Sequence, residues 1–246
     1  MLNLDLIKLE EIDSTNQFGK LNIDTLQDKQ VIVADRQLRG RGRFNRTWVC
    51  DNNSNVYLSI ILKPSLQEIE GYPFANLTQY LSVVLANFLE DEYGVIPTIK
   101  WPNDILIDGA KISGILCEAQ SSNNEIKGLV LGLGVNLNMT EETIKKIDQK
   151  ATSLNLLIGQ TVDKDLFINK LLDNFFERYD DFKQKGFELI KEEYINRCDF
   201  LNKKIKITNN QSVNEYFAEK INTDGSLRVS DEKNNLCDII TGDLTC

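Results

Sequence analysis

The stretch TIKWPNDILIDGAKISGILCEAQ, residues 98–120, decides the fold. Residues 98–101, 104–107 and 111–120 are rich in β-branched and large apolar side chains, which predicts three strands joined by short turns. The segment DGAK (108–111) is typical of a hairpin connection. IKGLVLGLGVNLN (126–138) predicts a fourth strand. Consecutive strands of this kind form a mixed or mostly antiparallel sheet rather than a regular βαβ series.

The segments before this stretch extend the sheet and begin to cover it. LDLIKLEEI (4–12), QVIVADR (30–36) and NVYLSIILKP (55–64) predict further strands. Asp13, Ser14 and Thr15 are candidate N-caps of a short helix after the first strand. In residues 71–93 the apolar side chains recur at helical spacing up to Gly94, which predicts one long amphipathic helix.

Residues after Met139 change to a helical pattern, with one helix expected over 166–179 and a second over 187–195. From Cys198 onward, four short segments predict the strands of a small β-barrel: 203–208, 214–221, 226–230 and 236–240. We therefore expect an α+β fold with a mixed, mostly antiparallel sheet covered by helices. A catalytic domain would span residues 1–197 and a C-terminal β-barrel residues 198–246.

The composition limits the chemistry. Of the 246 residues, 41% are hydrophobic and 26% charged, as in an ordinary globular protein. The chain lacks a signal-peptide pattern and an apolar run of membrane-spanning length, so we expect a cytoplasmic protein with no membrane partner. Five scattered cysteines without a CxxC pair argue against disulfides and zinc. The net charge of −9 disfavours nonspecific nucleic-acid binding. Without histidine, chemistry must use Lys, Arg, carboxylates or bound cations.

An arginine cluster interrupts this acidic chain. Residues 36–46 hold five of its eight arginines, around the segment LRGRGRFNRTW (38–48). The cluster could be a basic tail, a solvated loop, or a phosphate clamp in which glycines admit an anion and arginines bind it. The position between two expected core strands disfavours the tail. A clamp explains both the glycines and the arginines.

Polar residues also lie within the strand segment 99–118, and such groups often line a ligand pocket. They are Lys100, Asn103, Asp104, Lys111 and Glu118. Asn103 and Asp104 could equally form a turn after Pro102, and Lys100 could lie on a solvated sheet face. Gly114 indicates a close approach of backbone or ligand. GLVLGLGVNLN (128–138) continues a strand, so it is not a dinucleotide-binding turn, and no Walker A sequence occurs.

Four ordered motifs resemble those of the biotin protein ligases: DSTN (13–16), GRGRFNRTW (40–48), KWPNDILIDGAKISGIL (100–116) and GLGVNLN (132–138). The resemblance extends to the C-terminal strands. It implies a class II synthetase-like biotin/lipoate ligase fold with an SH3-like C-terminal barrel. It also implies a two-step reaction, in which biotin and MgATP give biotinyl-5′-AMP, and a lysine of a biotin carboxyl carrier protein, a subunit of acetyl-CoA carboxylase, then receives the biotin.

The same resemblance implies roles for individual residues. The biotin site would comprise Ser14, Thr15, Asn16, Gln37, Gly40, Arg41, Gly42, Arg43, Lys111 and Gly114. The ATP site would comprise Arg43, Arg46, Trp48, Asn103, Lys111 and Asn136. Arg43 and Lys111 are the candidate catalytic cations, and the resemblance names no protein ligand for the metal. As a hypothesis from the chemistry, Asp104 accepts the proton of the carrier lysine in the second step.

The chain also departs from many relatives. The strand that leads to DSTN begins near Met1, so we expect no helix-turn-helix domain and no nucleic-acid partner. The C-terminal GDLTC lacks the basic residue that some relatives carry there, which leaves any ATP contact from that end open. A homodimer is a further open expectation. Lipoate or octanoate ligases, whose arginine motif normally contains a histidine, and a non-catalytic biotin-binding module are the alternatives.

Overall fold

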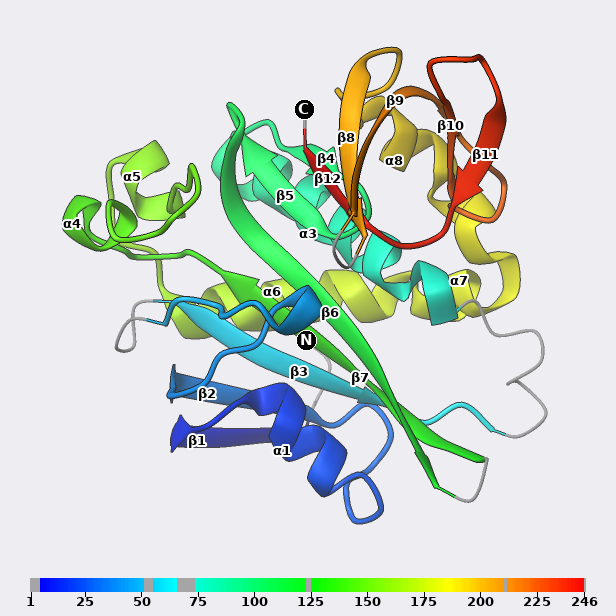
Figure 1. The fold of residues 1–246 in the computed structure, drawn as a ribbon. Coiled ribbons are helices and arrows are strands. Elements are labelled where there is room, and N and C mark those ends of the chain that lie inside the picture. Colours follow the sequence, from blue (N-terminus) through cyan, green and yellow to red (C-terminus); the bar gives the residue numbers. More distant parts are fainter. Residues whose placement is uncertain (1–4, 51–54, 66–73, 123–124, 210–211, 246) are drawn as a thin grey trace.

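The computed structural model describes residues 5–50, 55–65, 74–122, 125–209 and 212–245. Within these ranges the chain forms a large mixed sheet, a smaller C-terminal sheet and helices that cover them (Figure 1). None of the described helices combines the length and the apolar character that a membrane span needs.

The large sheet has seven strands in the order β1-β2-β3-β7-β6-β5-β4. The strands are β1 (Leu6–Ile12), β2 (Val31–Gln37), β3 (Val56–Leu62), β4 (Thr98–Lys100), β5 (Asp104–Ile107), β6 (Ala110–Ser122) and β7 (Glu125–Val135). Only β1 and β2 run parallel, and the other neighbours are antiparallel. The mixed, mostly antiparallel sheet is therefore confirmed.

Local sequence explains the centre of this sheet. Every residue of β3, VYLSIIL, is buried, as expected for a strand covered on both faces. The turn between β5 and β6 places Asp108 (φ 50°) and Gly109 (φ 71°) in the left-handed region. Asp-Gly is the pair that a tight hairpin turn of this type favours, so the predicted hairpin at 108–111 is confirmed.

Helices cover both faces of the sheet. They are α1 (Thr15–Leu21), η1 (Arg43–Asn45), η2 (Phe74–Asn76), α3 (Leu77–Tyr93), α4 (Glu141–Ile144), α5 (Leu154–Ile158), α6 (Lys164–Glu177), α7 (Tyr179–Lys185), η3 (Gly186–Leu189) and α8 (Lys191–Asn196). Leu129 and Leu131 of β7 join the main core with α3 and α6, whereas Val130 between them joins a small core under α1. Helices α1 and α6 thus lie on opposite faces (Figure 1).

Two helix ends follow from single residues. Ser14 caps α1 by accepting a hydrogen bond from the backbone N–H of Gln17, as its position in DSTN predicts. Gly94 ends α3 with a left-handed conformation (φ 67°), also as predicted. Gly19 lets α1 approach the sheet, because a Cβ there would lie 3.0 Å from side-chain atoms of Ile61 and Val130.

The C-terminal sheet has five antiparallel strands in the order β11-β10-β9-β8-β12. They are β8 (Lys204–Asn209), β9 (Ser212–Ile221), β10 (Leu227–Ser230), β11 (Leu236–Ile239) and β12 (Asp243–Thr245). Trp101 Nε1 donates to the carbonyl of Gly225 at 3.1 Å, and Gln79 Nε2 donates to the same oxygen at 2.8 Å. Gly225 thereby ties the small sheet to α3 and the turn after β4.

Several element boundaries differ from the sequence prediction. The strand expected over 126–138 ends at Val135, and Asn136 begins a loop. The helix expected over 187–195 is two pieces, η3 and α8, which are separated at Ile190. The long helix begins at Leu77, and residues 71–73 of its predicted range lie outside the described residues. Strand β12 was not predicted.

Candidate functional site

A cavity of about 540 Å³ opens between the centre of the large sheet, the start of α1 and the segment 38–50, which we call the arginine loop. Of the residues predicted for the site, the cavity is lined by Ser14, Thr15, Asn16, Gln37, Arg41, Gly42, Arg43, Arg46, Trp48, Asn103, Asp104, Lys111 and Gly114. Only Gly40 and Asn136 do not line it. The predicted residues of three segments that are distant in sequence, 14–16, 37–48 and 103–114, therefore meet at one site.

One end of the cavity has neutral hydrogen-bonding groups. Gln37 Oε1 accepts from the backbone N–H of Thr15 at 2.8 Å and from its hydroxyl at 3.2 Å. Buried Ser59 places its Oγ 2.8 Å from Thr15 Oγ1 and donates to Asn16 Oδ1 at 2.6 Å. These bonds fix the side chains at the start of α1 against β2 and β3. The neutral end is consequently rigid before any ligand binds.

Glycines form the floor of the cavity. A Cβ at Gly132 would lie 2.1 Å from Asn16 Oδ1, so only glycine leaves room for that amide. Gly114 and Gly134 are cross-strand partners on β6 and β7. A Cβ on either would meet the Trp48 ring, at 2.8 and 2.6 Å respectively. The indole thus lies directly on the sheet backbone, and its Nε1–H is buried without a hydrogen-bond partner among the described residues.

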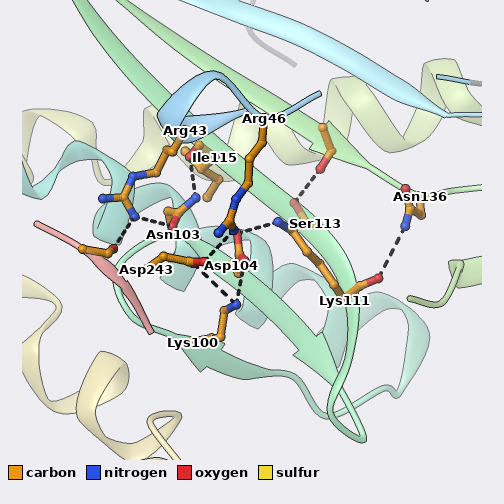
Figure 2. Close-up of polar contacts among 12 residues, drawn as sticks. Arg43, Arg46, Lys100, Asn103, Asp104, Lys111, Ser113, Ile115, Asn136 and Asp243 are labelled. Atoms are coloured by element: carbon orange, nitrogen blue, oxygen red, sulfur yellow. Dashed lines mark hydrogen bonds and ion pairs between the residues drawn. The ribbon is translucent and has the colours of Figure 1, made fainter. Parts of the chain in front are cut away.

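The opposite end of the cavity is charged (Figure 2). Asp104, which is 5% exposed, lies between two lysines: Lys111 Nζ is 2.8 Å from Asp104 Oδ1, and Lys100 Nζ is 3.2 Å from Oδ2. Asp104 is therefore balanced by a lysine ammonium at each carboxylate oxygen. The Lys111 ammonium also lies 5.3 Å from the centre of the Trp48 ring, within cation–π range.

The arginine loop covers the charged end of the cavity. Arg43 donates to Asn103 Oδ1, to the Gly242 carbonyl and to Thr241 Oγ1, each at 3.0 Å. Arg46 pairs with Asp243 of β12 at 2.5 Å. Burial lowers the pKa of the Arg43 guanidinium, whereas the charges of nearby carboxylates raise it. The loop is therefore held to the C-terminal sheet as well as to the turn before β5.

Two predicted residues support the site from outside the cavity. A Cβ at Gly40 would lie 2.7 Å from both Cys50 Sγ and the Trp48 carbonyl, so glycine lets the two sides of the loop approach. Asn136 is buried and donates to the carbonyls of Lys111 and Thr152. Its position fixes the backbone that carries Lys111.

Sequence reasoning missed several lining residues. Asp243 comes from β12, and the segment 147–149 contributes Ile147, Asp148 and Gln149. Neither segment carries a motif that marks it. Gly132 and Gly134 stood out as glycines within a strand, and that signal could have placed them at a close approach. Ser59 lies behind the lining residues, and nothing in the sequence of its uniformly buried strand marked it as part of the site.

The acidic groups at the site do not form a metal cage. The described residues contain no group of three or more acidic or cysteine side chains that could hold a metal ion. Asp104 and Asp243 are instead paired with lysine or arginine.

Taken together, the site can hold a ligand with a neutral polar head at one end and anionic groups at the other. The cationic groups of Lys111, Arg43 and Arg46 converge at the end of the cavity where the anionic groups of the ligand would lie. Cys50 is the last residue of the arginine loop, and burial raises the pKa of its thiol, so it stays protonated at neutral pH and is a poor nucleophile. The arrangement suits electrostatic stabilisation of a reaction between anions rather than covalent catalysis.

Comparisons with known proteins identify the family of the chain. Residues 9–136, just over half of the chain, match the model of the biotin/lipoate A/B protein ligase family. The bifunctional ligase/repressor BirA of Bacillus spizizenii is 33% identical over 188 residues, which cover 76% of this chain and 57% of that protein. This chain thus spans little more than half of that relative's length.

Two further relatives match over most of their length. The biotin–[acetyl-CoA-carboxylase] ligase of Paracoccus denitrificans is 28% identical, with 89% of this chain and 91% of that protein covered. The structure of the biotin protein ligase from Aquifex aeolicus in complex with biotin and ATP is 27% identical and superposes with a TM-score of 0.82, covering 98% of this chain and 97% of that one. The chain belongs to the biotin/lipoate A/B protein ligase family.

Proposed function

We propose that the protein is an ATP-dependent biotin protein ligase, which forms biotinyl-5′-AMP and transfers the biotin to one lysine of a biotin carboxyl carrier protein. One observation carries the proposal: Lys111 and Arg43 converge at one end of the same cavity whose other end is the neutral Thr15–Gln37 wall. Biotin has a neutral ureido ring at one end and a carboxylate at the other. The polarity of the cavity matches that of this substrate.

In the first step, a carboxylate oxygen of biotin would attack the α-phosphorus of ATP. The new O–P bond forms while the bond to pyrophosphate breaks. Both reactants are anionic, so the main barrier is charge repulsion, and fixed cations lower it. Lys111 and Arg43 are proposed for that role, with Arg46, Trp48 and Asn103 on the nucleotide side. A carboxylate needs no base at neutral pH, so the lack of histidine is no obstacle.

Mg²⁺ belongs to the proposal as a companion of ATP. Bound to the phosphates, it would neutralise part of their charge. The pocket carboxylates are already balanced by lysine and arginine, so we propose no protein ligand for it.

In the second step, the ε-amine of the carrier lysine attacks the acyl carbon, AMP leaves, and the amine loses a proton. Asp104 is the proposed acceptor, because it is the carboxylate beside Lys111 at the charged end. Asp104→Asn should retain biotinyl-5′-AMP formation but slow transfer to the carrier. Undiminished single-turnover transfer by this variant would remove Asp104 from the step.

Other features of the proposal concern the whole chain. We propose a catalytic domain over residues 1–197 and a small β-domain over residues 198–246, with β12 of the latter closing the charged end of the cavity. A cytoplasmic location, the absence of a nucleic-acid partner and the open question of a homodimer stay as the sequence predicts them.

The test combines the purified protein with MgATP, a biotin carrier domain and either biotin or lipoate, and follows the mass of the carrier. The proposal expects the mass of one biotin on a single lysine, dependent on ATP. Transfer of lipoate in preference to biotin would assign the other acyl substrate of the family. Tight biotin binding without any transfer would indicate a non-catalytic module and contradict the proposal.

A further inference from the structure

Glu118 of β6 lies at the neutral end of the site, and the chemistry proposed above gives it no role. Its side chain is charged but only 15% exposed, and the rest of its segment suits the interior of a sheet. Burying a carboxylate is costly unless hydrogen bonds and opposite charges compensate it. The residues that compensate its charge therefore indicate which parts of the site Glu118 holds in place.

Both carboxylate oxygens have partners on α1. Glu118 Oε2 accepts from Asn16 Nδ2 at 3.1 Å, and Oε1 accepts from Lys20 Nζ at 2.9 Å. Asn16 and Lys20 are four residues apart, so they lie on the same face of the helix. The carboxylate thus spans that face and fixes it against β6.

The same carboxylate reaches the arginine loop. Arg41 Nη2 lies 3.7 Å from Glu118 Oε1, and Arg41 Nη1 donates to Gln17 Oε1 of α1 at 3.0 Å. Burial alone would raise the pKa of Glu118, but hydrogen bonds from Lys20 and Asn16 and the charges of Lys20 and Arg41 lower it overall. Glu118 is consequently ionised at neutral pH and can hold the cation of the loop.

Asn16 passes this restraint to the cavity wall. Its Nδ2 donates to Glu118 and to the Leu116 carbonyl, so its Oδ1 must face Ser59 and the floor at Gly132. Without the carboxylate, one of the two acceptors that fix the amide orientation is lost. The side chains of the cavity wall are then held less firmly in their hydrogen-bonded orientations.

We propose that Glu118 is a positioning residue of the biotin pocket, whose carboxylate joins α1, strand β6 and the arginine loop into one preformed unit. It touches neither the reacting carboxylate nor the phosphates. Lys111 is seven residues away on the same strand, on the order of 20 Å along an extended chain. Its effect is therefore on biotin binding and loop closure rather than on the chemical step. This inference rests on the proposed biotin ligase function.

The test is Glu118→Gln, which keeps the shape of the side chain and removes its charge. Initial rates of biotin-dependent pyrophosphate release, with the carrier domain in excess so that the enzyme turns over, give KM and kcat. Hydrogen bonds to charged groups typically contribute enough to change an equilibrium by about ten-fold, so the KM for biotin should rise by about ten-fold, with kcat within about two-fold of wild type. The matched control is Glu125→Gln, which breaks the exposed Glu125–Lys127 pair on the neighbouring strand and should leave both constants unchanged.

A coupling measurement separates positioning from a general loss of structure. Lys20→Met leaves the carboxylate in place but removes one partner, and should raise the KM for biotin by about three-fold. It also serves as the test if Glu118→Gln does not fold. In the double variant with Arg41→Met, Glu118→Gln should have a smaller effect than in wild type, because the two residues act through one contact.

The outcomes separate the two proposals. Failure of wild type and of Glu125→Gln to release pyrophosphate with biotin would overturn the proposed function itself. If these two are active, a KM for biotin in Glu118→Gln within two-fold of wild type overturns the positioning role. A fall in kcat with unchanged KM, or full additivity with Arg41→Met, would overturn it as well.

Discussion

One end of the cavity is neutral and fixed by the fold, whereas the other is ionic and assembled across distant segments. Thr15 and Gln37 are held by hydrogen bonds to neighbouring backbone and side chains of the large sheet. Lys111, Asp104 and Arg46 are held by ion pairs, one of which reaches the C-terminal β12. The neutral end is suited to recognition by shape, and the ionic end to stabilising charge that develops during reaction.

The contrast between the two ends of the cavity also explains why this acidic chain gathers its arginines in one loop. The two ends meet under the arginine loop, with Arg41 directed to Glu118 at the neutral end and Arg43 to Asn103 and the C-terminal sheet at the other. A movement of this one loop would thus affect both ends of the site. A single mobile element can couple binding of a first ligand to capture of a second.

The largest effect should come from the ionic end. Lys111→Met removes the cation beside Asp104, and we expect biotinyl-5′-AMP formation to slow by about a hundred-fold or more, as for loss of a group that stabilises transition-state charge. Quenched-flow measurement of the adenylate gives the rate. Lys127→Met on β7 is the matched control. A loss of biotin affinity much smaller than the loss of rate would sharpen the division, whereas an equal loss of biotin binding would break it.

An intermediate effect is expected at the neutral end. Gly132→Ala places a Cβ 2.1 Å from the position of Asn16 Oδ1, and a clash of this kind costs about 1–3 kcal/mol. The Kd for biotin should rise by roughly ten-fold, while the Kd for ATP should change little. Calorimetric titration of each ligand checks this.

Removing the obstructing amide provides the control for that variant. In an Asn16→Ala background the added methyl group has space, so Gly132→Ala should then cost much less than in wild type. Equal penalties in both backgrounds would show that the clash with Asn16 is not the cause.

The smallest effect should come from the link to the C-terminal sheet. Asp243→Asn weakens the pair with Arg46, whose side chain is 58% exposed. Exposed pairs contribute about 0–1 kcal/mol, so the KM for ATP should rise by about two- to five-fold, and less at high salt. Glu215→Gln, which breaks the exposed pair with Lys206 in the same sheet, should have no effect. A larger effect on biotin than on ATP would contradict the assignment of β12 to the ionic end.

The sequence predicted the strands well where burial imposes a clear pattern. β3 is buried throughout, β7 is buried over residues 128–133, and Asp-Gly marks the turn between β5 and β6. The short β12 escaped prediction because three residues carry too little periodicity. The division of residues 187–195 at Ile190 escaped prediction, because a helical pattern of apolar residues does not distinguish one helix from two short ones.

The same contrast applies to the site. The arginine loop and Lys111 carry unusual residue types in unusual places, so sequence reasoning found them. Asp243 and the segment 147–149 reach the cavity only because the chain folds back, and nothing local marks that approach. Glu118 was visible as a charged residue in a strand, but its partners on α1 became clear only from the structure.

The most direct measurement is a single turnover of stoichiometric enzyme with biotin and MgATP in the absence of carrier protein. The account predicts that close to one biotinyl-5′-AMP accumulates per chain and remains bound under the closed loop, with release of one pyrophosphate. ATP that stays intact in the presence of bound biotin would contradict the claim that the two ends of this cavity bring a carboxylate and a phosphate together.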